Sequence, residues 1–300
     1  AGYERPMWFA LDGEKSEYEY SYNYQNWYPS VEYETNNTIK NVGLFDLTPF
    51  SKFEIKSDKA HENLQKICTA DIKHDFGKCT YTQMLNEDGG IEADLTVVCI
   101  DKNNFRIISS AATRERDKFH IKKYLGDDIE LLDVTDDYCV FGIFGPKSRI
   151  LMQEVSSDDF SNENFKFASS KNIQIDNIKV WTQRLSYVGE LGYELYVKIS
   201  DAKNIYELLV EKGQKFNLSN CGMHALDTMR MESGFLHWGH DISPQENQFE
   251  SGLNFTISNK KNINFIGKKS LAKINKKKVE KIFAMFALKN SKPGMPLLLH

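Results

Sequence analysis

Residues 78–100, KCTYTQMLNEDGGIEADLTVVCI, carry the clearest structural signal in the chain. The segment Asn86-Glu87-Asp88-Gly89-Gly90 has the composition of a tight turn, and it separates two β-prone runs. This pattern predicts a β-hairpin. The next run, NFRIISSAA over 104–112, predicts a third strand and therefore a meander.

A second hairpin is predicted over 179–199, KVWTQRLSYVGELGYELYVKI. Its glycine-punctuated turn contains Glu190. Glu194 stands at the start of the apolar strand that follows, on the same face as Tyr196, because side chains alternate along a strand.

Each hairpin thus places a carboxylate just after a glycine-rich turn. Asp94 does so in the first hairpin, where it shares a face with Thr96 and Val98. Such a carboxylate can cap the hairpin end, or it can be a site residue held by a rigid strand. A buried glutamate without a partner is costly or becomes protonated, so Glu194 requires a cation or hydrogen-bond donor from protein or ligand. Two carboxylates in equivalent positions suggest two anchors around one cavity.

The rest of the chain predicts antiparallel strands interrupted by helices, without regular βαβ alternation, which indicates an α+β architecture. The tyrosine-rich residues 1–35 fit either a strand with an aromatic face or an irregular segment laid over a larger surface. No repeat stands out. The other expected elements are a strand, a turn at Pro49 and a strand over 42–55, a helix over 58–72 capped by Asp58, a basic amphipathic helix over 114–125, a strand, Gly-Pro turn and helix over 137–155, helices at about 203–212 and 223–233, a loop over 238–253, a solvated lysine-rich helix over 267–281 and a last strand over 281–290.

The composition excludes several classes of function. Three hundred residues with 41% hydrophobic content favour two or more subdomains, and a net charge of −4 gives no electrostatic footprint for nucleic acid. No apolar run is long enough to span a membrane, and no signal peptide is visible. Five cysteines without a C-x-x-C pair fit a reducing compartment, so we expect a cytoplasmic protein. Both termini look cut, which suggests a piece of a longer polypeptide.

Motifs for nucleotide cofactors and nucleophilic serine are absent: the sequence has no G-x-G-x-x-G, no Walker-type loop and no G-x-S-x-G. His224, His237 and His240 would need further ligands to hold a metal, so no metal site is expected and the last two are interpreted as polar loop residues. Arg230 and Glu232 are expected in an ion pair that fastens a helix to the next loop. Trp238 fits either core packing or a pocket wall.

Three motifs in order resemble the folate-binding aminomethyltransferase family, which includes the T-protein of glycine cleavage. They are NEDGGIEADLTV over 86–97, YVGELGYELYV over 187–197 and ALDTMRMESGFLHWGHDISPQENQFESGL over 225–253. The similarity runs from about Val42 to Leu288. YERPMWF over 3–9 and HWGHDISPQEN over 237–247 look like the C-terminal folate domain of sarcosine and dimethylglycine dehydrogenases.

The resemblance implies a ring of subdomains around a central tetrahydrofolate site, with a truncated C-terminal β-barrel. It divides the chain into a linker over 1–40, the folate-binding domain over 41–280 and the start of the barrel over 281–300. Asp94 matches the family's functional carboxylate beside the folate nitrogens, and Glu194 matches the pterin-binding glutamate. The other residues expected at the cofactor are Glu190 in the supporting turn, the backbone of Ile108, Phe50, Tyr187, Arg106 and Trp238. Leu226 departs from the family, because T-proteins carry an arginine there, which puts contacts to the glutamyl end of folate in doubt.

The implied activity takes the methylene unit of an oxidised N-methyl amine to give 5,10-methylenetetrahydrofolate. FAD would belong to a missing domain or to a partner chain. Three alternatives stay open: a stand-alone aminomethyltransferase of glycine cleavage, a folate-dependent demethylase and a non-enzymatic folate-binding protein. The third is disfavoured because Cys221 does not match the K-G-C-Y-x-G-Q type motif of such relatives.

Overall fold

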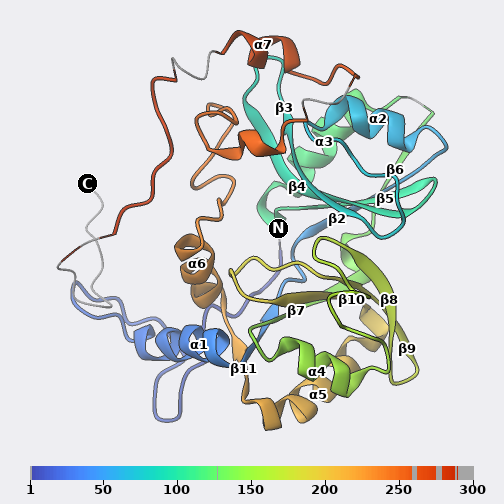
Figure 1. The fold of residues 1–300 in the computed structure, drawn as a ribbon. Coiled ribbons are helices and arrows are strands. Elements are labelled where there is room, and N and C mark those ends of the chain that lie inside the picture. Colours follow the sequence, from blue (N-terminus) through green and yellow to red (C-terminus); the bar gives the residue numbers. More distant parts are fainter. Residues whose placement is uncertain (1, 127, 259–261, 275–278, 288, 290–300) are drawn as a thin grey trace.

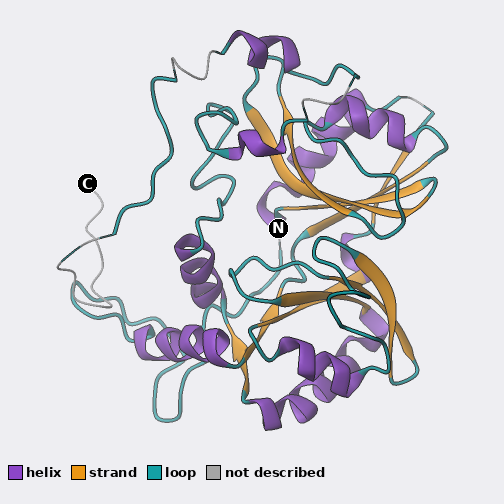
Figure 2. Cartoon of the chain, viewed as in Figure 1, coloured by secondary structure: helices purple, strands orange, loops and turns teal. Residues whose placement is uncertain are grey.

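The structure is a computed structural model, and it describes residues 2–126, 128–258, 262–274, 279–287 and 289. Two β-sheets lie face to face, and helices cover the outer face of each sheet (Figure 1). Loops dominate the chain beyond the last long helix (Figure 2). This arrangement confirms the predicted α+β class with antiparallel sheets.

The first sheet has five antiparallel strands in the order β3-β4-β5-β2-β6. Its strands are β2 (Ser51–Lys56), β3 (Cys79–Leu85), β4 (Ile91–Asp101), β5 (Asn104–Ser109) and β6 (Glu130–Asp133). Helices α2 (Ala60–Ile67) and α3 (Arg114–Tyr124) cover its outer face. Ala93, Leu95 and Val97 of β4 belong to the core on that side. Because side chains alternate, Asp94 and Thr96 point to the opposite face, toward the second sheet.

The second sheet has six strands in the order β11-β1-β7-β10-β9-β8. Its strands are β1 (Val42–Asp46), β7 (Tyr138–Phe144), β8 (Ser170–Ile175), β9 (Ile178–Gln183), β10 (Gly192–Lys198) and β11 (Leu218–Cys221). All neighbours are antiparallel except β1 and β11, which run parallel. Helices α4 (Ser148–Val155) and α5 (Ala202–Gly213) cover its outer face, where Tyr193, Leu195 and Val197 are buried.

A third hydrophobic core lies between the two sheets. Val98 of the first sheet, Phe45 and Tyr196 of the second, and Met229 of α6 (Met223–Glu232) belong to it. Ile108 is partly buried against the same core. The faces that carry Asp94 and Glu194 are therefore packed against each other.

Close packing fixes the turn of the first hairpin. The Asn86 side chain accepts hydrogen bonds from the backbone N–H groups of Asp88 and Gly90, and Gly89 has φ of +93°. A Cβ atom at Gly90 would lie 1.8 Å from the carbonyl oxygen of Pro244. Glycine is required there because another segment of the chain passes directly over the turn.

Several predictions for the N-terminal third need correction. Residues 28–40 form a helix, α1 (Tyr28–Lys40), which the aromatic alternation did not reveal, although Pro29 in its first turn suits a helix start. Asp58 does not cap α2. The Ser57 hydroxyl instead accepts a hydrogen bond from the backbone N–H of Lys59.

The predicted last strand is wrong for residues 281–287, where the structure has no strand, while 288 and 290 lie outside the described residues. A strand needs a partner strand, whereas the N–H of Phe283 donates to the carbonyl of Glu250, which lies in a loop. The side chains of Ile282 and Phe286 are exposed. The lysine-rich helix is shorter than predicted, with α7 (Lys268–Lys273) ending before the undescribed residues 275–278.

Candidate functional site

The two predicted hairpins repeat the same arrangement of side chains. In β3 and β4, Gln83 stands directly opposite Asp94, and in β9 and β10, Gln183 stands directly opposite Glu194. In both hairpins the glutamine precedes the carboxylate by the same number of residues. In both, Thr-Gln lies in the first strand and Leu-x-Val follows the carboxylate in the second strand. Contrary to the expectation of no repeat, the sequence therefore contains a weak one, and each of its two copies contributes one carboxylate to the facing sheets.

Asp94 is surrounded by protein but keeps part of its surface accessible. Gln83 Nε2 donates a hydrogen bond of 2.8 Å to its Oδ1. Burial raises the pKa of Asp94 to about 6, and hydrogen bonding from Gln83 and Tyr81 opposes this rise, whereas the charge of Asp117 adds to it. A carboxyl group with this pKa exchanges protons near neutrality, as a proton-transfer group must.

Glu194 occupies the equivalent position on the second sheet and is also partly accessible. The Tyr196 hydroxyl donates a 2.9 Å hydrogen bond to its Oε2. Burial raises the pKa of Glu194 to about 7, and only the Tyr196 hydrogen bond opposes the rise. Among the described residues, no lysine or arginine forms an ion pair with this carboxylate. It therefore keeps acceptor capacity for a ligand.

Glu190 lies in the turn between β9 and β10, partly buried, and burial raises its pKa. The turn is shaped by Gly189, which has φ of +79° and whose Cβ would lie 2.1 Å from the hydroxyl of Ser233. Glu190 is thus held on the turn that leads into Glu194.

Three further predicted site residues meet at the inter-sheet core, where Ile108, Phe50 and Tyr187 are partly buried. Ile108 pairs with Thr96 in the register of β4 and β5, which places it beside Asp94. The Tyr187 hydroxyl donates to the carbonyl of Leu236 at 2.6 Å. Burial raises the pKa of Tyr187. The charge of Arg230 opposes this rise, and the charge of Asp94 adds to it. Tyr187 therefore lies within electrostatic reach of Asp94.

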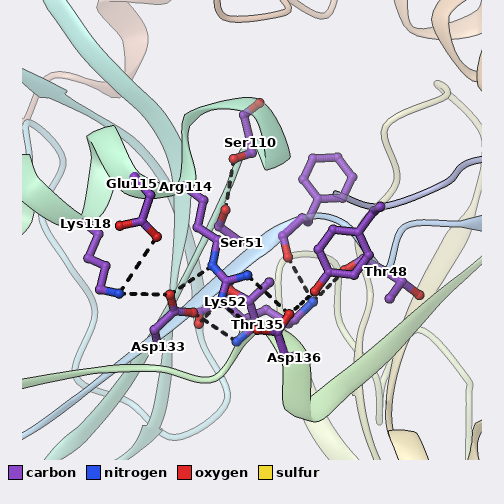
Figure 3. A network of polar contacts seen from close by, with 12 residues as sticks. Thr48, Ser51, Lys52, Ser110, Arg114, Glu115, Lys118, Asp133, Thr135 and Asp136 are labelled. Carbon is purple, nitrogen blue, oxygen red and sulfur yellow. Dashed lines mark hydrogen bonds and ion pairs between the residues drawn. The ribbon is translucent and has the colours of Figure 1, made fainter. Parts of the chain in front are cut away.

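A buried lysine holds the turn that carries Phe50, which the sequence did not suggest. Lys52 has no exposed surface, and its Nζ donates to the carbonyls of Thr48 at 2.8 Å and Phe50 at 2.9 Å. Figure 3 shows this lysine beside Thr135, whose hydroxyl accepts the backbone N–H of Lys52 at 3.0 Å. Burial lowers the pKa of Lys52 to about 8. The turn before β2 is thus fixed from inside the fold.

The same network continues to the protein surface (Figure 3). Arg114 of α3 binds Asp133 at 2.9 Å and Asp136 at 2.9 Å. These contacts tie α3 to the segment after β6, and the Tyr3 hydroxyl donates to Asp136. The N-terminal segment is therefore attached next to the Phe50 turn.

Arg106 already has a protein partner. Its Nη2 lies 2.6 Å from Glu54, and both side chains are buried. The guanidinium also lies over the rings of Tyr138 and Tyr196, at 4.6 and 5.8 Å from their centroids. In the part of the chain that is described, its Nη1 has no hydrogen-bond partner. Arg106 thus supports Tyr196, which in turn donates to Glu194.

Trp238 is fixed at the start of β4. Its Nε1 donates to the carbonyl of Ile91 at 2.9 Å, and the guanidinium of Arg116 lies 4.2 Å from its ring centroid. Trp238 therefore contacts β4, the strand that carries Asp94, rather than β10, the strand that carries Glu194. Leu226, where T-proteins were expected to have arginine, is buried in the inter-sheet core.

Arg230 has a structural role. Arg230 forms ion pairs, as predicted, but with Asp227 and Asp241 rather than with Glu232. The Asp241 pair fastens α6 to the following loop. Across the described ranges, no group of three or more His, Cys, Asp or Glu side chains is placed to hold a metal ion.

Two surface hollows lie away from the carboxylates. The larger, of about 410 Å³, lies between the turn after β3 and helix α3, with Glu92, Arg116 and His120 in its lining. The smaller, of about 210 Å³, is lined by Trp27 and His224 among others. Neither contains Asp94 or Glu194, so the carboxylate pair is identified by its chemistry rather than by surface shape.

Comparison with known proteins gives a consistent assignment. Residues 1–261 match the family described as the GCVT N-terminal domain. The chain is 38% identical to 4-methylaminobutanoate oxidase (formaldehyde-forming) of Paenarthrobacter nicotinovorans and 34% identical to the mitochondrial dimethylglycine dehydrogenase of Rattus norvegicus. These alignments cover 91% and 92% of the chain and 33% of each relative. The chain therefore spans about a third of the length of these two proteins.

An aminomethyltransferase of Halothermothrix orenii is 30% identical over 91% of the chain and 77% of its own length. The fold matches the crystal structure of glycine cleavage system aminomethyltransferase T from Bartonella henselae with a TM-score of 0.74, covering 86% of the chain and 70% of that structure at 22% identity. Among the described helices, none has the length and apolar character needed to cross a membrane. The chain belongs to the aminomethyltransferase family defined by the GCVT N-terminal domain.

Proposed function

We propose that this chain binds tetrahydrofolate between its two sheets and transfers a one-carbon unit from an oxidised N-methyl amine of the sarcosine or dimethylglycine type, giving 5,10-methylenetetrahydrofolate. Relatives named dimethylglycine dehydrogenase and formaldehyde-forming 4-methylaminobutanoate oxidase support this amine class. The observation that supports the proposal most directly is the pair of partly accessible carboxylates on facing sheets, Asp94 and Glu194. Each of them accepts a hydrogen bond from an uncharged side chain of the protein.

Glu194 would anchor the pterin. The pterin edge presents an amino group and a ring N–H side by side, and an ionised carboxylate can accept both. Glu194 has the required free acceptor capacity, because Tyr196 provides its one hydrogen bond among the described residues. Glu190 would support the turn, and the buried Arg106 would hold Tyr196 in place.

Asp94 would serve the reacting end. Tetrahydrofolate, when bound, supplies the amine nitrogen that takes up the carbon unit. Asp94 would stabilise positive charge at that nitrogen and accept its proton, a role that suits a pKa of about 6. The backbone of Ile108 and the side chains of Phe50, Tyr187 and Trp238 would line and position the site around it.

The amine oxidation would take place on a flavin domain or a partner chain, since the relatives with this substrate class are about three times longer than the matched region. We place the chain in the cytoplasm because its five cysteines form no disulfide bond.

Calorimetric titration with 5-formyltetrahydrofolate tests the proposal. We expect the parent to bind, Glu194→Ala to lose at least about tenfold in affinity, since a charge-assisted hydrogen bond is worth about 1.5–3 kcal/mol, and Asp94→Ala to keep most of it. Glu211→Ala, at an exposed glutamate of α5, is the matched control. Retained affinity in Glu194→Ala, or none in the parent, would contradict the proposed site.

A stand-alone aminomethyltransferase is the second candidate, supported by the relative from Halothermothrix orenii, most of whose length is matched. Substrate competition separates the two. Release of ammonia and 5,10-methylenetetrahydrofolate from a lipoyl-bound aminomethyl donor, with no acceleration of the spontaneous condensation of formaldehyde with tetrahydrofolate, would favour the second candidate. A 5-methyl product would indicate the demethylase instead.

A further inference from the structure

A buried chain of side-chain hydrogen bonds connects Asp94 to the loop over 243–257. Gln83 Nε2 donates to Asp94 at 2.8 Å. On its other side, Gln83 Oε1 accepts from Gln248 Nε2 at 2.7 Å and from the Thr256 hydroxyl at 2.5 Å. Gln248 Nε2 also lies 3.0 Å from the hydroxyl of Thr69. The chain therefore runs from the loop through β3 to the carboxylate.

The side chains of this hydrogen-bond chain are too deeply buried for a ligand to touch them. Gln83 and Gln248 have no exposed surface, and Thr256 is 8% exposed. Any influence that they have on chemistry must therefore pass through a group that a ligand can touch. Asp94 is that group, because it is partly accessible and Gln83 is its hydrogen-bond partner.

The two donors from the loop determine which way the Gln83 amide faces. An amide has a donor end and an acceptor end that differ little in shape. Gln248 Nε2 presents a hydrogen to Gln83 Oε1, and the Thr256 hydroxyl divides its single hydrogen between Gln83 Oε1 and the carbonyl of Leu253, which lies 2.7 Å away, so the Gln83 NH₂ group is turned toward Asp94. Without them the amide can turn over, and its oxygen would then face the carboxylate oxygens, a repulsive contact for the ionised form.

We propose that Gln248 and Thr256 are positioning residues for Asp94, acting through the orientation of the Gln83 amide. The inference rests on the proposed function only for the role of Asp94 in the reaction. It assigns to the loop over 243–257 a specific task, which is to keep a hydrogen-bond donor on the functional carboxylate.

Main-chain contacts hold this loop in register with the hairpin. The N–H of Ile91 donates to the carbonyl of Glu246 at 2.9 Å. The carbonyl of Pro244 lies where a Cβ of Gly90 would be. The loop is thus anchored to the start of β4, close to Asp94 along the same strand.

The charges around Asp94 come from other elements. Tyr81 of β3, Asp117 of α3 and Tyr187 of the β9–β10 connection act on it or respond to it. The two acidic residues of the loop are engaged elsewhere, since Glu246 pairs with Lys281 at 2.9 Å and Glu250 accepts the backbone N–H of Asn247 at 3.0 Å. The loop therefore acts on Asp94 through hydrogen bonds rather than through charge.

A mutant cycle read by NMR tests the proposal. The chain is labelled with [4-¹³C]aspartate, the Asp94 resonance is assigned by its loss in Asp94→Asn, and its pKa is measured in the free protein. The variants are Gln83→Met, the pair Gln248→Met/Thr256→Val, and all three substitutions together. Ser251→Ala, at another buried polar residue of the loop, is the matched control.

We expect Gln83→Met to raise the pKa of Asp94 by about one unit, because it removes a donor to the ionised form. The pair Gln248→Met/Thr256→Val should raise it by about half as much, and should add nothing when Gln83 is already methionine. An equal shift in both backgrounds, or no shift from the pair in the wild-type background, would overturn the proposal. If the Gln248→Met/Thr256→Val variant does not fold, Thr256→Val alone replaces it in the same mutant cycle.

The NMR measurement needs no folate, so its result is independent of the proposed function. If the cycle behaves as expected and 5-formyltetrahydrofolate does not bind, the network stands and the proposed function fails. If folate binds and the cycle is additive, the proposed function stands and the positioning role fails. Where both hold, the acid limb of the pH profile of kcat should move upward in the pair variant, with KM for tetrahydrofolate changing less than twofold.

Discussion

Replacing Glu194 by glutamine should make the free protein more stable and folate binding weaker. Glu194 is largely enclosed by protein atoms, and no cation from the described residues pairs with it, so its ionised form is unfavourable in the fold. Glutamine has the same shape and keeps an oxygen for the Tyr196 hydroxyl. The substitution removes the charge and leaves the packing.

The pH dependence follows from the pKa of Glu194, which is about 7 in the fold against 4.5 ordinarily. The folded protein therefore binds more protons than the unfolded chain between these two values, and this contribution to stability is lost as pH rises through 7. The interval corresponds to roughly 3 kcal/mol at about 1.36 kcal/mol per pH unit. Because the group is partly accessible, we expect Glu194→Gln to gain about 1–3 kcal/mol at pH 8 and little at pH 4.5.

Urea unfolding of both proteins between pH 4.5 and pH 8 measures this gain, with Glu211→Gln of α5 as the control whose effect should not vary with pH. Calorimetry with 5-formyltetrahydrofolate on the same samples measures the loss of affinity. A variant less stable than wild type at pH 8, or a difference that is constant with pH, would falsify the reasoning, because it would mean that Glu194 is stabilised by an unrecognised partner.

Three further predictions concern Asp94 and two buried residues that support the site, Lys52 and Arg106. Asp94→Asn should reduce kcat more than it weakens folate binding, and the wild-type kcat should fall below an apparent pKa of about 6, where Asp94 becomes protonated; a pH–rate profile checks both. Lys52→Met leaves two carbonyls, one of them that of Phe50, without their donor, so we expect the free energy of unfolding in urea to fall by about 1–3 kcal/mol. This loss should grow between pH 8 and 10.5, because the folded-state pKa of Lys52 is depressed. Arg106→Met should cost about 1–3 kcal/mol, because the buried Glu54 keeps Lys56 at 2.9 Å but loses the guanidinium, and adding Glu54→Met should restore much of that stability; no recovery would mean that the ion pair is not the main contribution of Arg106.

Local sequence was sufficient for the elements whose information is local. The hairpin over 78–100 combines an Asn-Gly-rich turn with alternating apolar residues, and it forms as predicted, as do the strands on either side of Pro49 and helices α4, α5 and α6. In these segments turn chemistry and hydrophobic period agree, so no tertiary contact has to override them. The resemblance of three motifs also gave the correct family.

Segments that depend on distant partners were not predictable in this way. Helix α1 follows an aromatic run that fits several conformations, and its buried Glu34 accepts hydrogen bonds from the backbone N–H groups of Phe9 and Gly222, which are far apart in the sequence. The extended residues 281–287 have strand-like sequence but no strand to pair with among the described residues. Secondary structure in such segments is decided by what lies beside them.

For the candidate site, the order of residues is enough to show which side chains carry charge and that Asp94 and Glu194 follow equivalent turns. Folding brings these carboxylates onto facing sheets and turns the Gln83 amide toward Asp94, and it leaves Glu194 without a cationic partner among the described residues. The reason is physical: a side chain's type is set by its codon, but its pKa and its free hydrogen-bonding capacity are set by burial and by neighbours from remote parts of the chain.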